Sequence, residues 1–129
     1  ALAGRPVPIN GDGLQSRDFT YVGDVVDVLA EVALGGLDSA HPVNLAFGRR
    51  WTLLDVVAEL ETLLGRSLEV VFGPDRPGDV RHSQADPTGL EQLLGIRNPV
   101  ELDAGLARTL AWWTPGSATH GQAAAGQRT

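Results

Sequence analysis

The chain has 129 residues and a formal net charge of −6 at pH 7, which argues against a nucleic-acid or anionic-membrane partner. Its length fits one small domain, and the lack of cysteine excludes disulfides, thiol catalysis and zinc–thiolate sites. No apolar run is long enough to span a bilayer and the first residues show no signal-peptide pattern, so we expect a cytoplasmic protein.

The first predicted element is an extended segment that contains Pro6 and Pro8. Proline fixes φ and lacks an amide proton, so this segment is either an edge strand or a plain linker. A turn at 11–13 follows, because Gly11 and Gly13 permit tight turns. A short strand is then predicted from residue 17 to residue 22. Its Arg17 carries a planar guanidinium that suits a carboxylate or a phosphate, which makes this strand edge a candidate anion site.

A helix is predicted over residues 24–34, with Asp24 as its N-cap. Val25, Val28 and Val32 recur at helical spacing inside it, and glycines at 35 and 36 end it. Asp18 and Asp24 could also form a carboxylate pair for acid–base chemistry. A turn hydrogen bond and a helix cap are the favoured interpretation of these two residues.

The middle of the chain is predicted to contain two strands and a helix. Residues 43–47 form a short apolar run without alternation, which is typical of a strand buried on both faces of a parallel sheet. Thr52 and Asp55 have the spacing of a capping box for a helix that runs to Leu64. A second strand is predicted at 68–72, before a loop rich in proline and glycine.

The last third of the chain is predicted to hold two helices and a tail. Asp86 is expected to cap a helix over 87–94, and the last helix is expected to start near Asn98. Residues 114–129 are rich in small and polar residues, so we expect a disordered tail. The predicted domain therefore spans residues 1–113.

The loop after the second strand carries Arg76 and Asp79, three residues apart. A cation and a carboxylate at this spacing can hold an anionic group beside neighbouring hydroxyls, which is the chemistry of a nucleoside diphosphate. From the residues alone, an ordinary ion pair within the loop is the more frequent explanation.

Two segments of the sequence resemble the signatures of a known family. GDGLQSRDFTYVGD at residues 11–24, and RPGDVR at 76–81 followed by ADPT at 85–88, are similar to segments of the NAD-dependent nucleotide-sugar epimerases and dehydratases. These enzymes are extended short-chain dehydrogenases/reductases, here of the UDP-glucose 4-epimerase-like type. The resemblance implies an α/β fold: the C-terminal, substrate-binding part of an extended Rossmann-type fold, with the N-terminal dinucleotide-binding part missing from this sequence.

The resemblance also implies which residues bind the substrate. Arg17 and Arg76 would grip the two phosphates of a nucleoside-diphosphate sugar, and Asp79 would hold its ribose. Pro8 and Asn10 would line the base pocket.

A further implied position is Phe19, at a place where the family often has an aromatic side chain near the substrate. Phenylalanine has no hydroxyl, so a polar role is not expected there. UDP, dTDP and GDP sugars all stay open as substrates, as do epimerisation and dehydration.

The cofactor and the catalytic groups of the family are expected to lie elsewhere. The family holds NAD(P) on a glycine-rich turn between a strand and a helix, and its chemistry uses a Tyr-x-x-x-Lys pair. This sequence has one tyrosine, Tyr21, no lysine, and a strand after its Gly11–Gly13 turn. We therefore expect NAD or NADP in the complete protein only, with no catalytic residue and no metal site in this chain.

The expected function is the nucleotide-sugar-binding part of an NAD(P)-dependent sugar-nucleotide epimerase or dehydratase. The alternative is a non-catalytic nucleotide-binding or interaction module derived from that family. The expected partners are a nucleoside-diphosphate sugar and the N-terminal NAD-binding part of the same protein. A homodimer stays open, and neither nucleic acid nor a membrane is expected.

Overall fold

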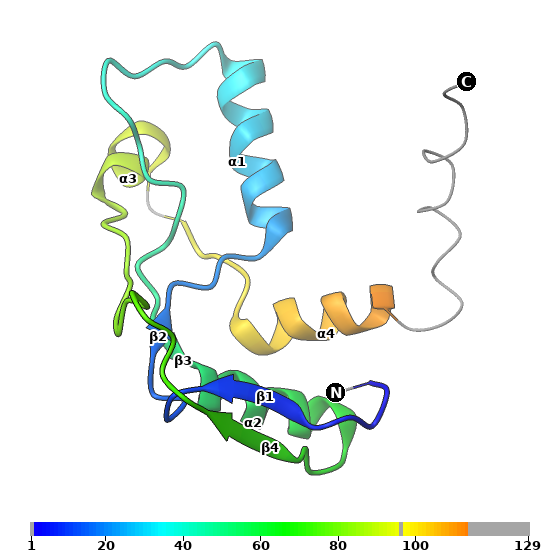
Figure 1. Ribbon diagram of the computed structural model, residues 1–129. Helices are drawn as coiled ribbons and strands as arrows, with labels where there is room; N and C mark the ends of the chain where they lie inside the picture. The colour runs from blue at the N-terminus through cyan, green and yellow to red at the C-terminus, as the bar shows by residue number, and fades with distance from the viewer. Residues whose placement is uncertain (1, 96, 114–129) are drawn as a thin grey trace, which may run out of the picture.

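The computed structural model describes residues 2–95 and 97–113, which form a mixed α/β structure (Figure 1). In chain order the elements are β1 Val7–Asn10, β2 Ser16–Arg17, α1 Val22–Gly35, β3 Trp51–Thr52, α2 Leu53–Leu64, β4 Val70–Gly73, α3 Thr88–Leu94 and α4 Leu102–Trp113. The α/β class predicted from the sequence is confirmed. The predicted tail at 114–129 lies outside the described residues.

β1 and β4 lie side by side as a two-stranded parallel sheet (Figure 1). The register runs from Val7 opposite Val70 to Asn10 opposite Gly73. The proline-containing segment is therefore a strand and not a linker. Parallel strands need a long crossover connection, and here that connection includes α1, β3 and α2.

The core lies between this sheet and α2. Ile9 of β1 and Leu68 before β4 are buried with Val57 of α2, and partly buried leucines and valines pack around them. Because side chains alternate along a strand, Pro8 and Asn10 face away from this core, and both are exposed. One face of β1 thus packs into the core and the other is exposed.

The capping box of α2 is confirmed. The Thr52 hydroxyl accepts a hydrogen bond from the Asp55 amide at 3.1 Å, and the Asp55 carboxylate accepts one from the Thr52 amide at 2.8 Å. These bonds satisfy amide groups at the start of the helix that would otherwise lack partners. The Thr52 hydroxyl also donates to the Asp55 carboxylate at 2.7 Å, and this bond, together with the one from the Thr52 amide, lowers the pKa of Asp55. Gly65 ends the helix with φ 63°.

The predicted start of α1 was wrong by two residues. The helix begins at Val22, its N-cap is Tyr21, and no side chain caps it. Asp24 lies within the first turn, where the positive end of the helix dipole stabilises a carboxylate. Its side chain accepts a hydrogen bond from the Val100 amide at 3.0 Å, so it ties α1 to the segment before α4.

Two predicted strands differ from the structure. The strand expected over 17–22 is limited to Ser16–Arg17, which pairs antiparallel with β3. The apolar run 43–47 is not a strand, because a strand requires a neighbour to complete its ladder and none runs beside it in the described part of the chain. The Asn44 side chain instead donates to the Asp86 carbonyl at 3.3 Å.

The starts of the last two helices are also shifted. α3 begins at Thr88 with Pro87 at the cap position, while the Asp86 carboxylate accepts from the Thr88 amide at 3.0 Å. α4 begins at Leu102 and not near Asn98. Residues 97–101, which precede α4, are assigned to neither a helix nor a strand.

One face of α1 is open to solvent. Val22, Val26 and Leu29 lie three and four residues apart on one helical face, and each is more than half exposed. The described helices are all too short or too polar to cross a membrane.

The capping box supplies the first test. Replacing Thr52 by alanine should lower the free energy of unfolding by about 1 kcal/mol, because one amide of the first turn loses its acceptor. Thr62→Ala is the matched control, since Thr62 lies in the last turns of α2 and its hydroxyl only donates to the Ala58 carbonyl. Thermal unfolding compares the variants, and an equal Tm for both would contradict this role of Thr52.

Candidate functional site

A polar cavity of about 260 Å³ lies where β1 ends and the loop after β4 begins. We refer to it as the arginine cavity. Its lining consists of Asn10, Gln15, Asp75, Arg76, Asp79 and Arg81. Three of the predicted site residues, Asn10, Arg76 and Asp79, therefore meet at one place.

The glycine turn after β1 lies between two residues that line the cavity, Asn10 and Gln15, and its Gly11 packs against a third, Asp75. Gly11 and Gly13 have φ 75° and 78°, a region that side chains other than glycine disfavour. A Cβ on Gly11 would lie 2.5 Å from a carboxylate oxygen of Asp75, and one on Gly13 would lie 2.9 Å from the Leu54 side chain. Both glycines are needed because other groups approach the main chain so closely.

The loop after β4 brings Arg76 and Asp79 together. The Asp79 amide donates to the Arg76 carbonyl at 3.1 Å, which closes a turn over the two residues between them. Gly78 has φ 78° inside this turn. The predicted cation–carboxylate pair is thus held on a defined turn.

Arg17 reaches the same loop from β2. One of its terminal nitrogens forms an ion pair with the Asp79 carboxylate, and the other donates to the Ser16 carbonyl at 2.8 Å. Arg17 and Asp79 are 62 positions apart in the sequence. The structure therefore joins the two signature segments through side chains that were predicted separately.

Ser16 fastens β2 to the end of the loop. Its amide donates to the Arg81 carbonyl at 2.9 Å, and its carbonyl accepts from the Ser83 amide at 3.0 Å. Its hydroxyl lies 2.9 Å from Nδ1 of His82. Ser16 is almost fully buried, so these bonds form in an interior position that excludes competing water.

A second ion pair closes the loop over the glycine turn. Two nitrogens of Arg81 each donate to one carboxylate oxygen of Asp12 at 2.7 Å. This two-point geometry is the strong form of an arginine–carboxylate contact. It lowers the pKa of Asp12 and raises the pKa of Arg81.

Comparison of the sequence with known proteins identifies the family of this chain. The profile of the NAD dependent epimerase/dehydratase family matches residues 1–46. A UDP-glucose 4-epimerase of Mycolicibacterium smegmatis is 32% identical over 112 residues, which cover 87% of this chain and 36% of that relative. The chain belongs to the NAD-dependent epimerase/dehydratase family.

Two solved structures share the fold of this chain. A UDP-N-acetylglucosamine 4-epimerase from Methanobrevibacter ruminantium, in complex with UDP-N-acetylmuramic acid, is 31% identical with a TM-score of 0.77, over 86% of this chain and 35% of that chain. A UDP-glucuronic acid 4-epimerase from Bacillus cereus, in complex with UDP-glucuronic acid and NAD, is 30% identical with a TM-score of 0.69, over 81% and 34%. The fold is thus shared with Rossmann-type short-chain dehydrogenases/reductases, and the chain spans about a third of the relatives it matches.

Three of the residues that the family resemblance suggested, Pro8, Arg17 and Phe19, are not among the residues that line the arginine cavity, although Arg17 is paired with Asp79 at its edge. Phe19 lines a separate hollow of about 260 Å³ between the start of α1 and α4. Pro8 shares the outer face of β1 with Asn10 but is not among the residues that line the cavity.

Three cavity residues were missed by the sequence analysis: Gln15, Asp75 and Arg81. Gln15 is buried, and its amide donates to the Asn10 carbonyl at 2.7 Å, which holds the end of β1 against β2. Gln15 and Arg81 belong to the two segments that carry the family resemblance, and that membership was the available signal. Their contacts with Asn10 and Asp12 appear only in the folded chain.

The contacts of Asp18 support a structural role, the turn hydrogen bond, over a role in acid–base chemistry. One of its oxygens accepts hydrogen bonds from the Gly48 amide at 3.0 Å and the Ala85 amide at 3.3 Å. Asp24 binds the Val100 amide, as described above. Asp18 thus holds two loop segments together, and Asp24 ties α1 to the segment before α4.

The residues of this chain do not fit the family's dinucleotide. A dinucleotide pyrophosphate is held where a glycine-rich turn opens a helix, but the Gly11–Gly13 turn leads into β2. Among the described residues, no group of three or more His, Cys, Asp or Glu side chains could hold a metal ion.

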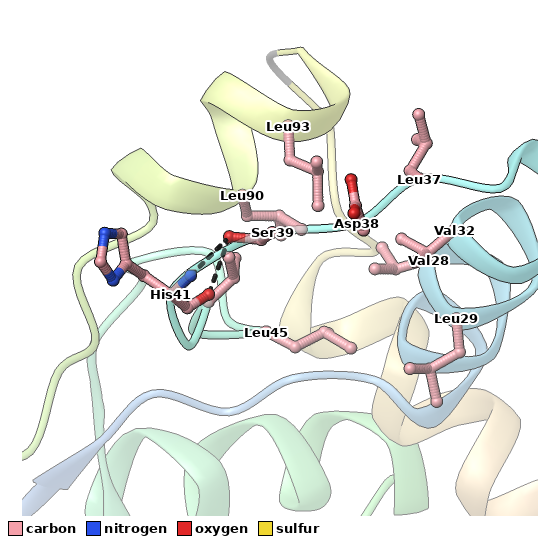
Figure 2. Close-up of a pocket in the computed structure, with 11 residues that line it drawn as sticks. Val28, Leu29, Val32, Leu37, Asp38, Ser39, His41, Leu45, Leu90 and Leu93 are labelled. Atoms are coloured by element: carbon pink, nitrogen blue, oxygen red, sulfur yellow. Dashed lines mark hydrogen bonds between the residues drawn. The ribbon is translucent and has the colours of Figure 1, made fainter.

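A third hollow, of about 220 Å³, lies between α1, the segment after it and α3 (Figure 2). Its walls are mainly aliphatic, with Val28, Leu29, Leu90 and Leu93 directed toward it. The Ser39 hydroxyl donates to the His41 carbonyl at 2.8 Å at its edge. Without an arginine in its lining, this hollow is a poorer match for an anion than the arginine cavity.

The Asp12–Arg81 pair makes stability depend on pH. A carboxyl whose pKa is lower in the folded state stabilises the fold above its ordinary value of 3.8, and this contribution is lost as pH falls through the lower folded pKa. Asp12→Asn should therefore reduce the loss of Tm that wild type shows between pH 6 and pH 3, roughly the window around that carboxyl pKa. Arg81→Ala should have the same effect. The double variant should show no further change, and additive effects of the two substitutions would contradict the pairing.

Proposed function

We propose that this chain binds the nucleoside diphosphate of a nucleotide sugar for an NAD(P)-dependent epimerase or dehydratase. The observation that carries this proposal is that Arg76 and Asp79 line one cavity at the end of β1, while Arg17 reaches the edge of that cavity through its ion pair with Asp79. Three relatives support the substrate class, because each is a 4-epimerase of a UDP-sugar and two of them were solved with a UDP-sugar bound.

Each group has a chemical task in this proposal. Arg17 and Arg76 bind oxygens of the two phosphates, since a guanidinium presents a planar set of donors to such anions. Asp79 accepts hydrogen bonds from ribose hydroxyls. The outer face of β1, at Pro8 and Asn10, lies along the base, and Phe19 lies toward the sugar.

The chain contributes positioning and not proton or hydride transfer. Binding the nucleotide part fixes where the sugar lies, so that remote binding energy supports the reaction at the sugar. The cofactor, NAD or NADP, and the Tyr/Lys pair would come from sequence other than these 129 residues.

The open face of α1 supports the presence of a further part that covers it. Val22, Val26 and Leu29 expose a contiguous apolar surface of the kind that packs against another part of a protein. We propose that the NAD-binding part of the same protein covers this face.

A second candidate is a non-catalytic nucleotide-binding module. It is favoured by the absence of any lysine from the sequence, which excludes a Tyr-x-x-x-Lys pair in this chain. The reading frame upstream distinguishes the two: a glycine-rich strand–turn–helix with Tyr-x-x-x-Lys supports the enzyme, and a frame without them supports the module.

Replacing Arg76 tests the proposed function. Arg76→Ala should weaken UDP binding by about 1.5–3 kcal/mol, because one charge-assisted contact to phosphate is lost. Arg76→Lys should restore only part of the affinity, since an ammonium lacks the planar fork. Titration calorimetry on the protein as its gene encodes it measures both.

The matched control is Arg66→Ala. Arg66 is an exposed arginine beyond the C-terminal end of α2, whereas the arginine cavity lies near the N-terminal end of that helix. The control removes the same charge and should leave UDP affinity near wild type. Equal UDP affinity in wild type and Arg76→Ala would remove the basis for the proposed function.

A further inference from the structure

The three arginines of the proposed site do not have the same surroundings. Arg17 is paired with Asp79, and Arg81 is paired with Asp12. The Arg76 side chain, in contrast, makes no ion pair or hydrogen bond with any described residue. Of these three arginines, Arg76 is therefore the one whose guanidinium an anion can bind without displacing a carboxylate.

The formal charge around the arginine cavity also cancels. The charged groups at the cavity and its two ion pairs are Arg17, Arg76, Arg81, Asp12, Asp75 and Asp79. A diphosphate that enters this cluster meets as many carboxylates as guanidinium groups. Its binding to Arg17 would place a phosphate next to the Asp79 carboxylate, and two anions at such a distance repel each other.

The Arg17–Asp79 pair is suited to exchange. Its side chains are 30% and 36% exposed, and ion pairs that are open to water contribute little to stability. Asp79 lies on an exposed turn. Arg17, in contrast, lies in β2, where its guanidinium is also held by a hydrogen bond to the Ser16 carbonyl. The carboxylate can thus leave while the guanidinium stays in place.

We infer that Asp79 is a displaceable counter-ion of Arg17. In the unliganded protein it neutralises Arg17, and an incoming diphosphate takes its place and releases it to the ribose hydroxyls. Asp79 therefore opposes the binding of a diphosphate alone and favours a ligand that carries a ribose beside its diphosphate. This inference rests on the proposed function and adds to it a basis for selecting nucleotides over free diphosphate or phosphate.

The test measures inorganic pyrophosphate and UDP binding by calorimetry, on the protein as its gene encodes it. Asp79→Asn should tighten pyrophosphate binding by about two- to fivefold, the range expected for freeing one partner of an exposed ion pair. The same substitution should weaken the preference for UDP over pyrophosphate, because the ribose loses a charged acceptor.

Asp75→Asn is the comparison variant, since it removes the same charge from the same cavity without touching Arg17. Its gain in pyrophosphate affinity should be smaller than that of Asp79→Asn. In an Arg17→Ala background, Asp79→Asn should give no gain.

The outcomes separate the two proposals. If wild type binds UDP but Asp79→Asn leaves pyrophosphate affinity unchanged or weaker, the counter-ion role is wrong and the proposed function stands. The counter-ion role is also wrong if Asp75→Asn raises the affinity for pyrophosphate as much as Asp79→Asn does. It is wrong as well if Asp79→Asn still raises that affinity in the Arg17→Ala background. If wild type binds neither UDP nor pyrophosphate, both proposals fail.

Discussion

The site depends on the pairing of Ser16 with the end of the loop that follows β4. Two main-chain hydrogen bonds, to Arg81 and from Ser83, and the contact with His82 hold this loop against β2. Arg17 and Asp79 are 62 positions apart in the sequence, and these bonds are what hold their two segments close enough for an ion pair. A loop of this composition loses much conformational entropy when it is ordered, and buried hydrogen bonds of this kind offset that loss.

Local patterns were predicted well where the partners lie close in the sequence. The capping box of Thr52 and Asp55 depends on residues three positions apart, and it was confirmed. The apolar run 43–47 was not a strand, because strand formation is decided by a neighbour that the run does not specify. The Asp12–Arg81 and Arg17–Asp79 pairs could not be predicted for the same reason. The family resemblance identified Arg76 and Asp79 as a pair of site residues, but it did not reveal which carboxylate neutralises which arginine.

Under the proposed function, this chain supplies recognition and another part of the protein supplies the chemistry. It belongs to the NAD-dependent epimerase/dehydratase family, and it spans about a third of the length of the relatives it matches. Within it, α2 packs against the inner face of β1 to form the core (Figure 1), while the outer face of β1 is exposed and the loop after β4 lines the arginine cavity. α1 lies at the other end of the described fold from α2 (Figure 1), and its exposed apolar residues offer a surface on which a further part can pack.

The most direct test of the central claim is a crystal structure of the protein with UDP bound. The account predicts that the two phosphates lie between Arg17 and Arg76, with the ribose hydroxyls at Asp79 and the base along the outer face of β1. UDP bound at the apolar hollow between α1 and α3, or with its phosphates away from both arginines, would contradict it.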